Sequence, residues 1–316
     1  MSKRISTISL MLLLLCVTTS AKADELHMVF LPIVIDTTPN MGAHVWSTRH
    51  VPVLAPGSIA YVPVYPDNAM YTYHDNVMPL LMGRPVVLGF RNWTGEPECL
   101  PPPPDEYDDW AAWVATTTQD YIADGHTIIA VEVWNEPEPA DGGHYWGCWG
   151  NTEEAGAQYA ELVREVYQRI GGQVDVIGGA LMFYTLPEPP PFWIGAIGGG
   201  VDDYLDGVSY HNYSGWPTNN WETVFDKADI LRQYTDKPLW VTETSLMCDN
   251  DCGEQFEHDQ AAYLDYVMNG ASAHGIEAVM WFMAGYNNWR NTDLVREDYS
   301  FKPVFYEYEK YFSMRK

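Results

Sequence analysis

Short apolar runs alternate with amphipathic stretches along most of the chain. From residue 84 onward, six runs rich in apolar residues are typical of buried strands: 84–90, 127–134, 174–180, 205–211, 238–243 and 277–282. Stretches with helical periodicity follow or separate them: 107–123, 153–170, 221–234, 259–274 and 302–312. Continuously apolar strands that alternate with helices indicate a parallel sheet whose outer face is covered by helices.

The part before residue 84 must supply two more strands if this sheet closes into an eight-stranded barrel. Residues 43–46, or instead 27–35, are candidates for the first strand, and 59–64 for the second. The length suits such a barrel, which takes about 250 residues. We therefore expect an α/β fold, a (β/α)8 TIM barrel, with a short and irregular N-terminal part in which the first helix is not evident.

The N-terminus has the features of a secretory leader. Lys3 and Arg4 precede an apolar run at 10–16, and Ala21-Lys22-Ala23 has the form of a cleavage site. That run is too short to span a bilayer, and no later segment is long enough. We expect cleavage near Ala23 and a secreted or periplasmic protein.

A lipoprotein is the less favoured alternative. Lipid attachment would use Cys16, but the residue before such a cysteine is normally small, and here it is Leu15. On the leader interpretation, residues 1–23 are removed and residues 24–316 form a single domain.

The charge of the chain limits its partners. The sequence has 17 basic and 43 acidic residues; the leader holds three of the former and none of the latter, so the remaining chain has a formal charge of −29. Such a surface repels nucleic acid, whereas a neutral ligand tolerates it. We expect no nucleic-acid partner, no membrane span and a monomer.

Four cysteines remain after the leader, an even number that suggests disulfides in an exported protein. Three pairings are possible, and we favour Cys248–Cys252 with Cys99–Cys148. No Cys or His pair with metal-ligand spacing has a matching second pair, so we expect no metal and no other cofactor.

Two glutamates follow the fourth and seventh predicted strands, at the barrel face where active sites gather. Glu136 lies in Trp134-Asn135-Glu136-Pro137, and Glu243 ends the strand at 238–243. Facing carboxyl groups can protonate a leaving oxygen and attack an anomeric carbon. Because side chains alternate along a strand, we expect Glu132 on the side of Trp134 and Glu136, pairing with a buried base. Glu138 is expected in the following loop.

Four motifs in this order closely resemble clan A glycoside hydrolases. The first is Asn135-Glu136-Pro137, and the second is the other glutamate, 107 residues after Glu136. The strand-six motif of that clan is similar to Ser209-Tyr210-His211-Asn212-Tyr213, and its strand-eight motif is similar to Met280-Trp281-Phe282. Residues 86–113 look most like family 39 and its relatives, with family 5 next.

The resemblance implies a role for each matching residue. Glu136 would be the acid/base, Glu243 the nucleophile, Asn135 a ligand of the sugar 2-hydroxyl, Tyr213 a hydrogen-bond donor to Glu243, His211 an orienting group, and Trp281 the floor of the subsite for the sugar to be cleaved. The arginine usual near the end of strand two is not evident at 62–65, and Arg91 is its candidate replacement.

The expected function is therefore that of a secreted retaining glycoside hydrolase with one catalytic barrel domain. It would cleave β-glycosidic bonds of a carbohydrate substrate by double displacement, with carboxyl groups about 5–5.5 Å apart. A transglycosylase shares the covalent intermediate and stays open. A binding protein on an inactive scaffold is disfavoured because both carboxylates are present. Trp146, Trp149, Trp216 and Trp289 occupy loops, and each belongs either to the cleft or to the core.

Overall fold

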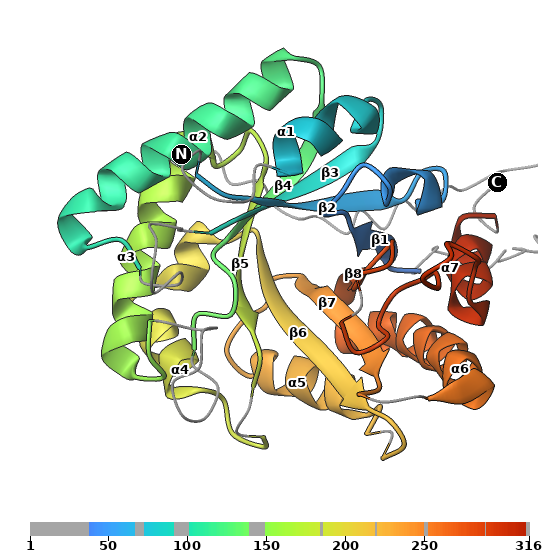
Figure 1. Cartoon of the computed structure of the whole chain (residues 1–316). Coiled ribbons are helices and arrows are strands. Elements are labelled where there is room, and N and C mark those ends of the chain that lie inside the picture. Colours follow the sequence, from blue (N-terminus) through green and yellow to red (C-terminus); the bar gives the residue numbers. More distant parts are fainter. Residues whose placement is uncertain are drawn as a thin grey trace, which may run out of the picture. The chain divides into compact units, whose positions relative to one another are not determined.

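Eight parallel strands close into a barrel in sequence order, which confirms the predicted (β/α)8 architecture (Figure 1). The computed structural model describes residues 38–66, 73–91, 101–138, 149–183, 186–218, 220–249, 252–287 and 289–313. The strands are β1 (Asn40–His44), β2 (Ile59–Val64), β3 (Pro85–Phe90), β4 (Thr127–Val133), β5 (Asp175–Leu181), β6 (Gly207–Gly215), β7 (Leu239–Met247) and β8 (Ile276–Trp281).

Helices surround the barrel: α1 (Tyr73–Val77), α2 (Tyr107–Ala123), α3 (Glu153–Ile170), α4 (Pro191–Gly198), α5 (Thr223–Leu231), α6 (Gly253–Ala271) and α7 (Pro303–Ser313). The predicted irregular start is confirmed, because only a 3-10 turn at Val51–Val53 lies between β1 and β2. The first strand lies at 40–44, close to one candidate; the other, 27–35, is outside the described residues. No helix in the described ranges could cross a membrane.

Local sequence explains which helices were predictable. α3 starts where the Thr152 side chain accepts a hydrogen bond from the backbone N–H of Ala155, and Gly171 follows its last residue. Its polar and apolar positions keep a helical period, so its predicted bounds are confirmed. α4 was missed because it is short and begins with Pro191 in a proline-rich stretch.

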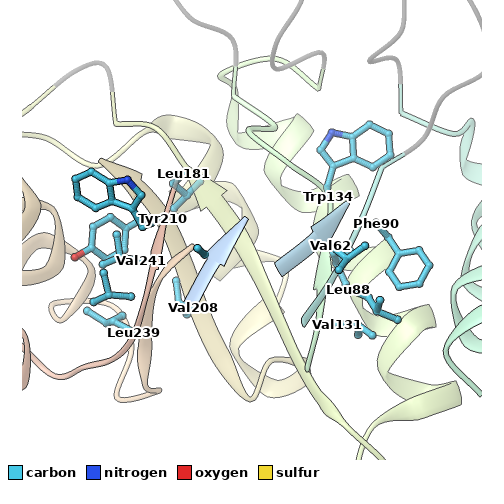
Figure 2. Packing of buried hydrophobic residues seen from close by; sticks show 14 of the residues in the cluster. Val62, Leu88, Phe90, Val131, Trp134, Leu181, Val208, Tyr210, Leu239 and Val241 are labelled. Carbon is cyan, nitrogen blue, oxygen red and sulfur yellow. The ribbon is translucent and has the colours of Figure 1, made fainter. Parts of the chain in front are cut away.

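Two apolar layers separate the inside of the barrel from its helical cover. Side chains that alternate along the strands fill the interior: Ile59, Tyr61, Val87, Ala130, Ile177, Trp240, Ala278 and Met280. Residues of the opposite parity pack under the helices, and Figure 2 shows several of them, among them Val62, Leu88, Val131, Val208 and Val241. This alternation decides which strand residues can reach the mouth of the barrel.

A buried polar pair lies within the barrel. Glu132 is fully buried, and one of its carboxyl oxygens accepts a hydrogen bond from the Tyr61 hydroxyl. Gly89 makes room for this contact, because a Cβ at that position would lie 2.0 Å from the hydroxyl oxygen. Glu132 thus faces the interior as predicted, but its partner is a phenol and the prediction of a buried base was wrong.

Candidate active site

Two carboxylates and a histidine meet at the carboxyl ends of the strands. Glu136 follows β4 and is 9% exposed; Glu243 belongs to β7 and is 4% exposed. A carboxyl oxygen of each and a ring nitrogen of His211 lie within 4.8 Å of one another. The structure therefore brings together the three residues that the motifs placed in one site.

Left-handed backbone brings Glu136 to this position. The φ angles are +71° at Trp134 and +45° at Glu136, a region that costs a non-glycine residue roughly 1–2 kcal/mol. The Trp134 indole packs in the outer layer, 5.9 Å from Trp110 and 5.5 Å from Trp149 between ring centroids. The prediction that Trp134 faces the same side as Glu132 was therefore wrong, because regular alternation ends with β4.

A β-bulge brings Glu243 to the same place. Along the β6–β7 ladder Tyr210 pairs with Val241, but His211 pairs with Glu243, so β7 has one extra residue. Val241 packs in the outer layer, and regular alternation would send Glu243 there too. The bulge turns its carboxylate to the barrel mouth instead, as bulges near functional sites often do.

His211 joins the two carboxylates. Its Nδ1 lies 2.8 Å from Glu136 Oε1 and 3.5 Å from Glu243 Oε2. Complete burial acts to lower the pKa of His211, but the negative charges of Glu243 and Glu136 outweigh it and raise the pKa above its ordinary value. A protonated His211 can donate from Nδ1 and orient the Glu136 carboxyl group.

Glu243 is surrounded by donors. The Tyr213 hydroxyl donates to Oε2, and Arg91 Nη2 lies 3.6 Å from Oε1. Burial, together with the negative charge of Glu136, raises the pKa of Glu243 above its ordinary value. The charges of His211 and Arg91 and the Tyr213 hydrogen bond act in the opposite direction. The donors therefore favour the ionised carboxylate against the effect of burial.

Arg91 and Asn135 both lie at this site. Arg91 Nη2 donates to Asn135 Oδ1 over 2.7 Å, in addition to its approach to Glu243. Its guanidinium also lies 5.8 Å from the centre of the Tyr65 ring. Arg91 thus lies beside both Asn135 and Glu243, and its replacement of the strand-two arginine stays a prediction.

His44 was missed by the sequence analysis. It ends β1, its Nε2 lies 2.7 Å from the carbonyl oxygen of Thr242, and its Nδ1 is 3.9 Å from Glu243 Oε1. Its place within the candidate first strand at 43–46 was the available signal, but that candidate ended at Trp46, whereas β1 ends at His44. The bond to the Thr242 carbonyl fixes the bulge next to Glu243.

The prediction that Trp281 lines the sugar subsite was wrong, because the structure places this side chain outside the candidate site. It is fully buried in the outer layer, donates from Nε1 to the Thr292 carbonyl, and lies 6.3 Å from the Tyr263 ring of α6. Its neighbours Ala278 and Met280 face the interior, so Trp281 has the opposite parity.

Phe282 occupies the position at the barrel mouth that was predicted for Trp281. Its ring lies 5.0 Å from His44 and 5.8 Å from Tyr213. Two tryptophans flank it, Trp46 at 5.9 Å and Trp289 at 5.3 Å. An aromatic wall of Trp46, Phe282, Tyr213 and Trp289 therefore stands next to Glu243.

The loop tryptophans divide between core and surface. Trp149 is 8% exposed and belongs to the core, and half-buried Trp216 donates to Asp259 of α6. Trp289 is 39% exposed and joins the aromatic wall. Trp146 lies outside the described residues.

The predicted Cys248–Cys252 disulfide is present, with Cα atoms 6.2 Å apart. Cys99 and Cys148 lie outside the described residues, so their pairing stays a prediction. Glu136, His211 and Glu243 are also close enough to hold a metal ion, which the sequence did not suggest. Arg91 places a fixed positive charge beside the Glu243 carboxylate, and this charge opposes the binding of a cation at these three residues.

The chain shares its fold with solved glycoside hydrolases. A family 39 glycoside hydrolase from Bacteroides cellulosilyticus WH2 superposes with a TM-score of 0.60 and 19% identity, over 90% of this chain and 66% of that chain. A family 128 (subgroup II) endo-β-1,3-glucanase from Sorangium cellulosum gives 0.57 and 17%, over 85% and 97%. An endo-1,4-β-D-mannanase from Thermotoga petrophila RKU-1 gives 0.57 and 12%, over 87% and 99%.

The sequence comparisons add no closer relative. No family model matches the chain, and no curated protein matches it. At these identities the structural likeness establishes the fold alone.

Proposed function

We propose that the protein is a retaining glycoside hydrolase that cleaves β-glycosidic bonds, with Glu136 as acid/base and Glu243 as nucleophile. The observation that carries this proposal is that one carboxyl oxygen of Glu136 and one of Glu243 lie within 4.8 Å of each other. Inverting enzymes keep their carboxyl groups roughly 6.5–9.5 Å apart to admit a water molecule. The shorter separation favours direct attack by one carboxylate on the sugar.

The first step uses both carboxyl groups. Glu136 gives its proton to the glycosidic oxygen as the bond to the anomeric carbon breaks, and a Glu243 oxygen forms a bond to that carbon. His211 contacts both carboxylates and can keep the Glu136 carboxyl group in position. Tyr213 and Arg91 support the ionised state of Glu243 that the attack needs.

The second step reverses these roles. Water gives a proton to Glu136 while its oxygen attacks the anomeric carbon, and the bond to Glu243 breaks. Asn135, held by Arg91, is the candidate ligand of the sugar 2-hydroxyl. Phe282, beside His44 and Tyr213, offers apolar surface to the C–H face of the reacting sugar ring.

The substrate class is a β-glycan. The similar structures include enzymes named for β-1,3-glucan and for β-1,4-mannan, so the fold is compatible with more than one polymer. The mature chain is strongly acidic, which favours a neutral polymer over a polyanionic one. We also propose export with loss of residues 1–23, which N-terminal mass spectrometry of the mature protein would test.

The experiment is reducing-sugar release from a panel of β-linked polysaccharides. Glu243→Gln should abolish release from every polymer, and Glu136→Gln should retain activity on aryl glycosides with good leaving groups, which need little protonation. Glu254 is an exposed carboxylate on α6, so Glu254→Gln is the matched control and should behave as the wild type. Equal loss by Glu136→Gln on natural and activated substrates would contradict the assigned roles.

Two further readouts separate the alternatives. Products longer than the substrate would indicate a transglycosylase, which shares the covalent step. Activity that disappears with a chelator and returns with a divalent ion would instead indicate that Glu136, His211 and Glu243 act as metal ligands. No release and no glycan binding would leave the proposal without support.

A further inference from the structure

The loop after β8 presents an aromatic side chain to solvent beside the candidate nucleophile. Trp289 is 39% exposed, although it contacts Tyr213 and Phe282 with centroid separations of 5.1 and 5.3 Å. Tyr213 in turn donates a hydrogen bond to Glu243. An indole supported from behind and open in front is a surface that a flat apolar ligand face can cover.

The disulfide loop after β7 holds this tryptophan in place. The residue after Trp289, Arg290, accepts a hydrogen bond at its carbonyl from the Cys248 N–H over 3.0 Å. Asn291 Nδ2 donates to the Cys248 carbonyl, also over 3.0 Å. Arg290 Nε lies 2.8 Å from Asp249 Oδ1, so three contacts join the two loops.

These contacts hold backbone that would not keep its conformation alone. Arg290 and Asn291 have φ angles of +48° and +57°. Asparagine tolerates this left-handed region, whereas arginine adopts it at a cost that its surroundings must offset. The Asn291 carbonyl also accepts hydrogen bonds from Gln260 and Lys302, each over 2.8 Å. The orientation of Trp289 therefore depends on the closed Cys248–Cys252 loop as well as on its own segment.

We propose that Trp289 is a sugar-binding platform for the residue of the glycan next to the one at Glu243, and that the Cys248–Cys252 disulfide positions this platform. The inference rests on the proposed function. A pyranose ring has an apolar C–H face of about the area of an indole, and stacking would remove both from water. The ligand is thus an oligosaccharide with at least one further sugar next to the one at Glu243, on the side of Trp289.

The test compares two substrates that contain the same sugar. An aryl β-glycoside of one sugar places no second sugar beside the one at Glu243, whereas an oligosaccharide does and so reaches Trp289. Trp289→Ala should raise KM for the oligosaccharide about tenfold or more, with little change in kcat or in activity on the aryl glycoside. Trp289→Phe should recover part of the loss, and Tyr306→Ala, which removes an exposed aromatic from α7, should change neither substrate.

The disulfide is tested by the paired variant Cys248→Ser/Cys252→Ser. It should raise KM for the oligosaccharide in the same direction, by a smaller factor, and leave turnover of the aryl glycoside unchanged. Dithiothreitol should have this effect on the wild type and none on the paired variant. Circular dichroism and the thermal midpoint confirm that each variant is folded.

The outcomes distinguish this inference from the proposed function. If the wild type cleaves glycans but Trp289→Ala loses activity equally on both substrates, or on neither, the platform is overturned and the hydrolase stands. An unchanged KM in the cysteine variant overturns the positioning role of the disulfide. A wild type that neither cleaves nor binds any glycan overturns both proposals together.

Discussion

Removal of one hydroxyl group inside the barrel tests whether the Tyr61–Glu132 pair stabilises the fold. Both side chains are fully buried, and within the described structure the second carboxyl oxygen of Glu132 has no hydrogen-bond partner. Tyr61→Phe would leave the whole carboxyl group without a donor. A buried acidic group that loses its partner costs about 3 kcal/mol. For a domain of this size, a loss of this magnitude lowers the thermal midpoint by roughly 6–12 °C.

The double-mutant cycle gives the sharper result. Glu132→Leu leaves the Tyr61 hydroxyl unpaired and should cost about 1–3 kcal/mol. The double variant Tyr61→Phe/Glu132→Leu leaves no orphaned polar group and should be about as stable as the wild type, because apolar replacement of a buried polar pair is often neutral. The expected coupling energy is therefore about 4–6 kcal/mol, the sum of the two single losses.

The assay is urea unfolding of the wild type and the three variants, followed by circular dichroism. Tyr210→Phe is the matched control, because that buried hydroxyl donates to the neutral carbonyl of Val224; its loss should cost about 1 kcal/mol. Single losses that add to within about 0.5 kcal/mol in the double variant would refute the reasoning.

Three further predictions follow from the contacts of single residues. Burial raises the pKa of Glu138 to about 7, so the folded state binds more protons than the unfolded state between pH 4.5 and 7. The free energy of unfolding should therefore fall by about 3 kcal/mol as the pH rises from 4.5 to 7. In Glu138→Gln the free energy measured by urea unfolding should change much less over the same pH range. Tyr213→Phe should lower kcat about 10–100-fold and move the acid limb of the pH–rate profile to higher pH, because a donor that lowers the pKa of Glu243 is lost; an unmoved limb would argue against this contact. Gly89→Ala should destabilise the fold by about 1–3 kcal/mol, measured by thermal unfolding, because its Cβ overlaps the Tyr61 hydroxyl; an unchanged midpoint would contradict the packing.

The order of elements was predictable because it depends on local patterns. α2 and α3 begin and end at the predicted residues. Glu136 follows β4 as expected, and Glu243 lies in β7, which continues to Met247 beyond the predicted end. In each case a continuous apolar run or a helical period decides the outcome, and tertiary contacts only reinforce it.

The direction of individual side chains was less predictable. Trp134 faces outward because its backbone is left-handed, and Glu243 faces inward because of the bulge in β7; neither feature leaves a mark in apolar periodicity. Trp281 and Phe282 are adjacent aromatics, so a motif alone could not decide which one reaches the barrel mouth. Parity along β8, anchored by Met280 in the interior, decides it.

The bulge in β7 gives the two halves of this strand separate evolutionary constraints. On the N-terminal side of the bulge, Trp240 fills the barrel interior. Another large apolar residue could replace it without changing the direction of Glu243, because the bulge lies between the two residues. The same arrangement makes the strand sensitive to changes in length. Insertion of one more residue between Val241 and Glu243 would turn the carboxylate into the apolar layer that Val241 joins, whereas most substitutions nearby would not. Deletion of Thr242 would remove the bulge together with the carbonyl group that contacts His44. Lineages that share this barrel should therefore tolerate exchanges in the lower half of β7 and resist insertions and deletions at its centre.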